Sequence, residues 1–73
     1  MKINQLQQKI GQRIRELRES KGITQQDLAA ACNFEKTNMS RIEAGRTNPT
    51  LSTLYKISQA LEITISELVN VEV

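Results

Sequence analysis

TQQDLAAACNFEKTNMSRIEAG, residues 24–45, has the pattern of two short helices joined by a tight turn. Thr24 is a favoured N-cap residue, so a helix is expected to begin directly after it. Asn33 ends the pattern of this helix and is one of the few non-glycine residues that accept a positive φ. A second helix is predicted over about 35–44, with Gly45 as its stop because glycine readily takes the left-handed conformation. The stretch therefore predicts a compact corner of two helices.

Amphipathic stripes continue outward from this corner on both sides. Helices are predicted over about 4–20 and 51–61, because apolar residues recur there at spacings of three and four. These residues are Leu6, Ile10, Ile14 and Leu17 in the first helix and Leu51, Leu54, Ile57 and Leu61 in the second. Thr64 and Glu67 form a full capping box, which predicts a fifth helix. The tail over 69–73 alternates apolar and polar residues, so it is expected either to pair with a second copy or to fray.

The inward-facing residues of the central pair follow the same spacing. Leu28, Cys32, Met39 and Ile42 are predicted to point into the core, and Phe34 is predicted to fill it next to the second helix. The expected fold is therefore all-α, with five helices in one domain over residues 1–73.

Length and cysteine content limit how such a domain is stabilised. A chain of 73 residues buries only about 60% of the surface of its unfolded form. Cys32 is the only cysteine and there is no histidine, so neither a disulfide nor a metal site is expected, and no cofactor is predicted. Helix packing, self-association or both are therefore the remaining ways to stabilise the domain.

The lone Cys32 favours a reducing compartment. No stretch approaches the roughly 20 apolar residues of a membrane span. We expect a cytoplasmic protein with no membrane contact.

Charge is distributed unevenly along the chain. Residues 1–46 hold nine Lys or Arg against five Asp or Glu, a net charge of +4, whereas residues 47–73 carry −2. A positive half suits a polyanionic partner, although a solvated surface with chance asymmetry is the plain alternative.

The quoted stretch, with RIRELR at 13–18 and NPTL at 48–51, resembles the Xre family of helix-turn-helix transcriptional regulators. This family includes the lambdoid phage repressors, the Cro proteins and the small controller proteins of restriction–modification systems. The resemblance covers residues 9–69. It implies a compact phage-repressor-like domain in which 24–44 forms the helix-turn-helix, with its second helix in the major groove of DNA.

Two residues near the turn depart from the family pattern. Asn33 stands where the family usually has glycine, a mild change because asparagine tolerates the same backbone angle. Glu35 stands where family members often have a serine or threonine cap. Glutamate is a poorer cap, although its charge favours a helix N-terminus. It also places a negative group close to the DNA, where it is expected to cost affinity or to select against some bases.

The resemblance assigns the outer face of the second helix to the DNA bases. The implied base-reading residues are Lys36, Thr37, Ser40 and Arg41. They share one helix face opposite the inward Met39, and lysine and arginine are residue types that pair with guanine O6 and N7. The plain alternative is an ordinary solvated helix face.

Further contacts are implied around this face. The candidate phosphate-contacting residues are Gln25, Asn38, Arg46, Thr47 and Asn48. Gln25 is also expected to steady the start of the second helix. For 46–48 the alternative is a plain polar turn. The resemblance also implies that Arg18 pairs with Glu43 and fixes the helix-turn-helix against the first helix, which is a structural role.

The C-terminal segment 63–73 is a possible dimerisation element. Its apolar residues are Ile63, Ile65, Leu68, Val69, Val71 and Val73. Their crowding, the small size of the chain and the family habit predict a homodimer. Alternatively, these residues complete the core of a single chain and the tail frays.

Together these patterns predict a transcriptional regulator of repressor, autoregulator or controller type that binds double-stranded DNA in a sequence-specific way. As a dimer it would read a pseudo-palindromic operator with half-sites about 34 Å apart. The alternative is an antitoxin or another protein-interaction module with secondary DNA binding. A toxin or RNA polymerase would be the corresponding protein partner. An enzyme is not expected, because no nucleophile–base pair or glycine-rich phosphate loop is found.

Overall fold

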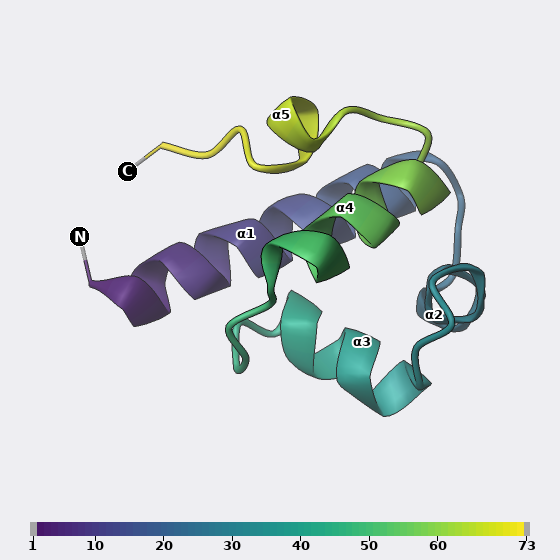
Figure 1. Cartoon of the computed structure of the whole chain (residues 1–73), viewed down its shortest axis with the longest axis horizontal. Coiled ribbons are helices and arrows are strands. Elements are labelled where there is room, and N and C mark those ends of the chain that lie inside the picture. Colours follow the sequence, from purple (N-terminus) through teal and green to yellow (C-terminus); the bar gives the residue numbers. More distant parts are fainter. Residues whose placement is uncertain (1, 73) are drawn as a thin grey trace.

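The computed structural model describes residues 2–72, and these form five helices and no strand (Figure 1). The helices are α1 (Ile3–Ser20), α2 (Gln25–Ala31), α3 (Lys36–Glu43), α4 (Leu51–Ala60) and α5 (Ile65–Leu68). The predicted all-α fold with five helices is confirmed, and the predicted helix boundaries agree with the observed ones to within one residue.

The helices pack in two groups around α1, the longest element (Figure 1). On one side α3 packs against both α1 and α2, and on the other side α5 packs against α1 and α4. A contact between α2 and α4 joins the two groups. As a result, α3 lies at the edge of the molecule with one side facing the other helices and the opposite side facing outward.

Threonine side chains begin three of the helices. Thr24, Thr50 and Thr64 each accept a hydrogen bond from the backbone N–H three residues on, at 3.0 to 3.1 Å. The full capping box at Thr64 is confirmed, because the Thr64 N–H in turn donates a hydrogen bond to the Glu67 carboxylate. The start of α3 differs: Glu35 is its N-cap residue but makes no side-chain capping bond. The carboxylate of Glu35 is therefore not used to begin the helix.

The turn between α2 and α3 depends on a left-handed residue. Asn33 has a φ of 63°, as predicted, and the Phe34 N–H that follows donates to the Ala29 carbonyl at 2.8 Å. Glu62, between α4 and α5, has a φ of 58° that the sequence did not indicate. Asparagine accommodates this geometry more readily than glutamate, because its short side chain can bond to the local backbone.

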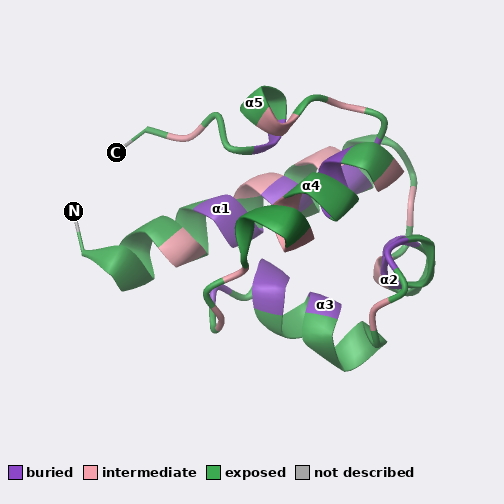
Figure 2. Cartoon of the chain, in the orientation of Figure 1, coloured by how far each residue is buried: buried purple, intermediate pink, exposed green. Residues whose placement is uncertain are grey.

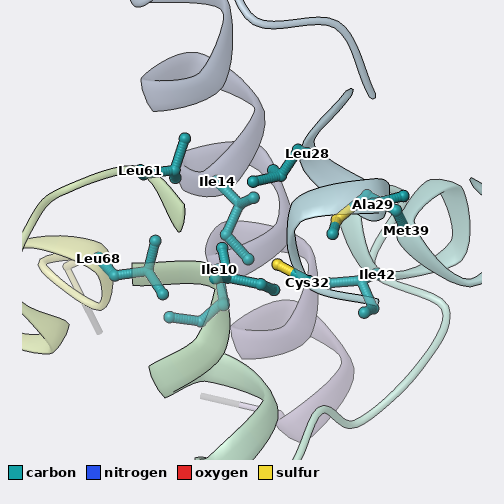
Figure 3. Close-up of a cluster of buried hydrophobic side chains, with 10 residues drawn as sticks. Ile10, Ile14, Leu28, Ala29, Cys32, Met39, Ile42, Leu61 and Leu68 are labelled. Atoms are coloured by element: carbon teal, nitrogen blue, oxygen red, sulfur yellow. The ribbon is translucent and has the colours of Figure 1, made fainter. Parts of the chain in front are cut away.

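The core lies where the inner faces of the helices meet (Figures 2 and 3). Its buried hydrophobic residues are Ile10, Ile14, Leu28, Ala29, Cys32, Met39, Ile42, Ile57, Leu61 and Leu68. The inward positions predicted for α2 and α3 are confirmed. Phe34 is only partly buried and packs against this cluster. Burial raises the pKa of the Cys32 thiol, as expected of a small core residue.

Two residues of the predicted apolar stripes are exposed. Leu6 in α1 is 37% exposed, and Leu51, the first residue of α4, is 74% exposed. Both continue an apolar stripe at the correct helical spacing, but each lies near the beginning of its helix, Leu6 in the first turn of α1 and Leu51 at the first position of α4. The other helices leave Leu51 largely uncovered and Leu6 partly uncovered.

Two glycines bring α1 close to the end of α3. A Cβ atom at Gly11 would overlap the Ile42 carbonyl oxygen and would lie 2.6 Å from the Glu43 carbonyl oxygen. A Cβ atom at Gly45 would lie 2.6 Å from the Cα atom of Gln8. Backbone atoms cannot turn aside as a flexible side chain can, so the distance between α1 and α3 requires these positions to lack side chains.

We therefore expect Gly11→Ala to destabilise the protein, although alanine is the better helix former by about 1 kcal/mol. The new methyl group must push α1 away from α3, and overpacking of this kind costs about 1–3 kcal/mol. Urea unfolding followed by circular dichroism measures the change. Gln12→Ala, at the next and exposed position of α1, is the control and should have little effect. A Gly11→Ala protein as stable as the wild type would contradict the close packing.

Candidate nucleic-acid interface

The outer face of α3 is exposed, as the burial colouring of Figure 2 shows. Its exposed polar residues are Lys36, Thr37, Asn38, Ser40 and Arg41. Within residues 2–72 none of these side chains makes a hydrogen bond or an ion pair. Met39 and Ile42 are buried on the inner face of the same helix. The donors and acceptors of the outer face are therefore available to an external ligand.

This face continues into a shallow depression on each side, of which the one beside α2 is the more polar. Lys36 lines one of them together with Gln25, at the start of α2. Asn38 lines another with Asn48 and Thr50, at the start of α4. The structure therefore brings most of the predicted base-reading and phosphate-contacting residues together on one surface around α3.

The turn from α3 to α4 contributes unequally to this surface. Arg46 and Asn48 are exposed, as a phosphate contact requires. Thr47 is partly buried, and its hydroxyl oxygen is buried without a hydrogen-bond partner in the part of the chain that is described. A buried hydroxyl that makes no hydrogen bond costs free energy. Arg46 and Asn48 thus offer side chains to a ligand more directly than Thr47 does.

A buried ion pair fixes α3 from behind. Arg18 Nε donates to Glu43 Oε2 at 2.8 Å, and Arg18 Nη2 donates to Glu43 Oε1 at 3.1 Å. Each residue is only 8% exposed. The remaining nitrogen of Arg18, Nη1, donates to the Ile23 carbonyl at 2.8 Å, and the hydrogen bond to Glu43 raises the pKa of the Arg18 guanidinium. This pair holds the end of α3 against α1 and against the segment that leads into α2.

Gln25 belongs to the same buried network. Its side-chain nitrogen Nε2 donates to Glu43 Oε1 at 3.1 Å, which joins the first residue of α2 to the last residue of α3. The sequence suggested that Gln25 steadies the start of the second helix, but its hydrogen bond goes to Glu43 at the end of α3, a partner that nothing in the sequence identified. Gln25 is only partly buried, and an amide nitrogen has a second hydrogen to donate, so Gln25 can hold Glu43 and still contact a phosphate.

The predicted dimerisation residues lie in different environments. Leu68 is 0% exposed and belongs to the core of the single chain, so it offers no surface to a partner and its assignment to an interface is corrected. Ile63, Ile65 and Val71 are partly buried, and Val69 is exposed. The sixth of these residues, Val73, lies outside the described part of the chain.

Two basic side chains attach the C-terminal segment to α1. Arg13 donates two hydrogen bonds to the Glu67 carbonyl, at 3.0 and 3.1 Å, and Lys9 Nζ donates to the Glu72 carbonyl at 2.8 Å. Residues 70–72 run beside α1 without forming a strand. Lys9 and Arg13 therefore have structural partners at some distance from the outer face of α3.

The structure also shows an apolar groove that the sequence did not predict. This apolar groove has a volume of about 290 Å³ and lies between the start of α1, α4 and the C-terminal segment. It is lined by Ile3, Leu6, Gln7, Ile10, Asn48, Pro49, Leu54, Val69 and Val71. Nearby on α4, Leu51 and Tyr55 are also exposed. Helical spacing identified Leu6, Ile10, Leu51 and Leu54 among the apolar residues of this region, but it does not reveal which of them remain uncovered.

Two classes of site are not found in residues 2–72. No group of three or more His, Cys, Asp or Glu residues there could hold a metal ion. None of the helices in that range is both long enough and apolar enough to cross a membrane.

A corner of two packed helices, with an exposed polar face on the second, defines a helix-turn-helix protein. The chain belongs to the helix-turn-helix family, whose model matches residues 14–68. It is 42% identical over 60 residues to an uncharacterised HTH-type transcriptional regulator of Sinorhizobium fredii, y4dJ, a match that covers 82% of this chain and 78% of that protein.

Solved structures agree with this assignment. The restriction–modification controller protein C.AhdI from Aeromonas hydrophila superposes with a TM-score of 0.82 and 38% identity, over 84% of this chain and 92% of that one. A structure of SinR, described as the master regulator for biofilm formation in complex with DNA, gives a TM-score of 0.77 and 35% identity, over 84% of this chain and 98% of that one. The resemblance to helix-turn-helix regulators and controller proteins is confirmed. Family membership also confirms that the chain is not an enzyme.

Proposed function

We propose that this chain binds double-stranded DNA in a sequence-specific way and regulates transcription, with α3 lying in the major groove. The observation that carries this proposal is the outer face of α3. Its polar side chains are exposed and unpaired within residues 2–72, while buried contacts hold the same helix rigidly from behind. The major groove of B-DNA is wide enough to admit an α-helix presented in this way.

Within this proposal four residues of α3 read bases. Arg41 and Lys36 donate to the O6 and N7 acceptors of guanine, which is the pairing most often used for guanine in the major groove. Thr37 either hydrogen-bonds to a base edge or contacts a thymine methyl group. Ser40 reaches a base edge or a neighbouring phosphate.

The flanking residues position the protein on the DNA backbone. Gln25, Asn38, Arg46 and Asn48 surround α3 on both sides and are proposed to contact phosphates, together with the backbone of Thr47. Contacts of this kind fix the register of a protein on the duplex and supply most of its affinity, but they carry no sequence information.

The function is tested by selecting duplexes from a random-sequence pool with the purified chain and then measuring affinity at several salt concentrations. We expect one enriched sequence motif, and an affinity for it that falls steeply as salt increases, because bound phosphates release counterions. A chain that enriches no motif, or that binds every duplex equally, would overturn the proposal.

We further propose that the chain binds DNA as a homodimer on a pseudo-palindromic site. A 73-residue chain offers little contact area alone, whereas a two-fold dimer presents two copies of α3 to successive half-sites. The proposed interface includes Ile63, Ile65, Val69 and Val71.

We also propose that the chain acts in the cytoplasm, where the DNA lies. Its single Cys32 agrees with this, because a lone cysteine suits a reducing compartment.

Light scattering at micromolar concentration is expected to give twice the 8.3 kDa mass of one chain. Val69→Asp should reduce this mass to that of a single chain, because it places a charge in the proposed interface. Gln12→Asp adds the same charge at an exposed position of α1 and should leave the dimer intact. A wild-type mass near 8.3 kDa would contradict the dimer.

A further inference from the structure

Glu35, at the N-terminal end of α3, has a carboxylate with no bonded partner among residues 2–72. It is exposed, and it is the N-cap residue of α3, with φ −72° and ψ 147°. Thr24, Thr50 and Thr64 use their side chains to cap their helices, whereas the Glu35 side chain makes no capping bond. Among residues 2–72 no donor or cation is bonded to it. The carboxylate therefore contributes nothing visible to folding.

The position of Glu35 brings it close to the bases if α3 binds DNA as proposed. In helix-turn-helix complexes the N-terminal residues of the recognition helix contact base edges. Glu35 directly precedes Lys36 and Thr37, two of the proposed base-reading residues. At this place a negative charge is repelled by phosphates and by base acceptors unless a base donates a hydrogen bond to it.

Only two bases offer such a donor in the major groove. An ionised carboxylate is purely an acceptor, and the exocyclic amino groups are N4 of cytosine and N6 of adenine. In a duplex the adenine amino group has an acceptor on both sides, its own N7 and O4 of the paired thymine, and both repel a carboxylate. The cytosine amino group has an acceptor on one side only, O6 of the paired guanine. Guanine and thymine present acceptors, O6 and N7 in guanine and O4 in thymine. The chemistry of Glu35 therefore favours cytosine.

We propose that Glu35 determines specificity at one base pair of each half-site, by accepting a hydrogen bond from N4 of a cytosine. The carboxylate also disfavours guanine and thymine at that position, because their acceptors would face it. This proposal rests on the proposed function and adds to it one position at which the base is fixed by a negatively charged residue.

Selection from random duplexes with wild type, Glu35→Ala and Glu35→Gln tests the proposal. We expect the wild type to prefer cytosine at one position by about tenfold, as for a good side-chain–base pair. Glu35→Ala should lose the preference at that position alone. Glu35→Gln should shift it towards adenine, because glutamine pairs with adenine N6 and N7. Lys36→Ala is the matched control and should relax a different position.

Thermal unfolding should show that all these variants are folded, since Glu35 and Lys36 are exposed and make no side-chain bonds within residues 2–72. The proposal is overturned if wild type selects a motif without this cytosine, or if Glu35→Ala keeps the cytosine preference. If wild type selects no motif at all, the proposed function fails and the role of Glu35 fails with it. The two failures are therefore distinguishable.

Discussion

A Lys36→Ala, Arg41→Ala double variant is expected to lose selective DNA binding while its fold remains intact. Each good bidentate pair with a base contributes about 1–3 kcal/mol of discrimination, so the loss of two should reduce affinity for the selected duplex by roughly a hundredfold or more. Both side chains are exposed and make no hydrogen bond or ion pair in residues 2–72, so their removal should hardly change stability. Fluorescence anisotropy on the selected and on a scrambled duplex measures both affinity and selectivity.

The loss of positive charge alone would also weaken binding, so a control with matched charge is needed. Lys2→Ala with Lys21→Ala removes two positive charges from exposed positions outside α3. This control should weaken binding to both duplexes to a similar, smaller extent and should keep the ratio between them. A Lys36→Ala, Arg41→Ala protein that is folded and still binds the selected duplex as tightly and selectively as wild type would show that α3 does not read the bases.

Glu43→Ala is expected to destabilise the protein much more than Arg41→Ala does. It leaves the guanidinium of Arg18 buried without its carboxylate, and breaking a buried pair from one side costs about 3–5 kcal/mol. It also removes the acceptor of the Gln25 amide. Small domains have only about 5–15 kcal/mol of total stability, so a large part of it should disappear. Urea unfolding measures the loss.

Arg41→Ala serves as the control for this substitution, because Arg41 lies on the same helix but is exposed and unpaired within residues 2–72.

The raised pKa of Arg18 also determines how its contribution to the free energy of unfolding depends on pH. A group whose pKa is higher in the folded state contributes its stability at every pH below its unfolded pKa, and loses it only as the pH rises through the folded pKa. The Arg18 contribution should therefore be constant between pH 6 and 9. Equal melting temperatures for Glu43→Ala and Arg41→Ala would refute the structural importance of the pair.

The network around Glu43 also connects stability to the proposed binding function. Gln25 lies beside Lys36 in one polar depression and donates to Glu43 at the other end of α3. A single carboxylate thus holds the start of α2, the end of α3 and the inner face of α1. Because base contacts require α3 to lie precisely in the groove, this rigid support is as important to recognition as the exposed residues are.

Local signals in the sequence were sufficient to predict the helices and the turn. Thr24 and Thr64 marked helix starts through their ability to accept a hydrogen bond from the following turn, and Asn33 marked the place of a positive φ. These features depend on residues within four positions of each other, so they can be inferred without a tertiary structure. The outer face of α3 also follows from helical spacing, although its role in DNA binding was inferred from resemblance and remains a proposal.

The sequence alone determined which residues form helices, where the chain turns and which face of each helix is apolar, because all of these depend on neighbours along the chain. The tertiary structure decided which apolar residues are covered: Leu68 is buried in the core, while Leu51 remains exposed at the edge of the fold. It also decided that Gln25 joins Glu43 and that Gly11 allows α1 to touch α3. Helical spacing fixes the direction of a side chain around its own axis, but coverage and partners depend on where the other helices lie in space.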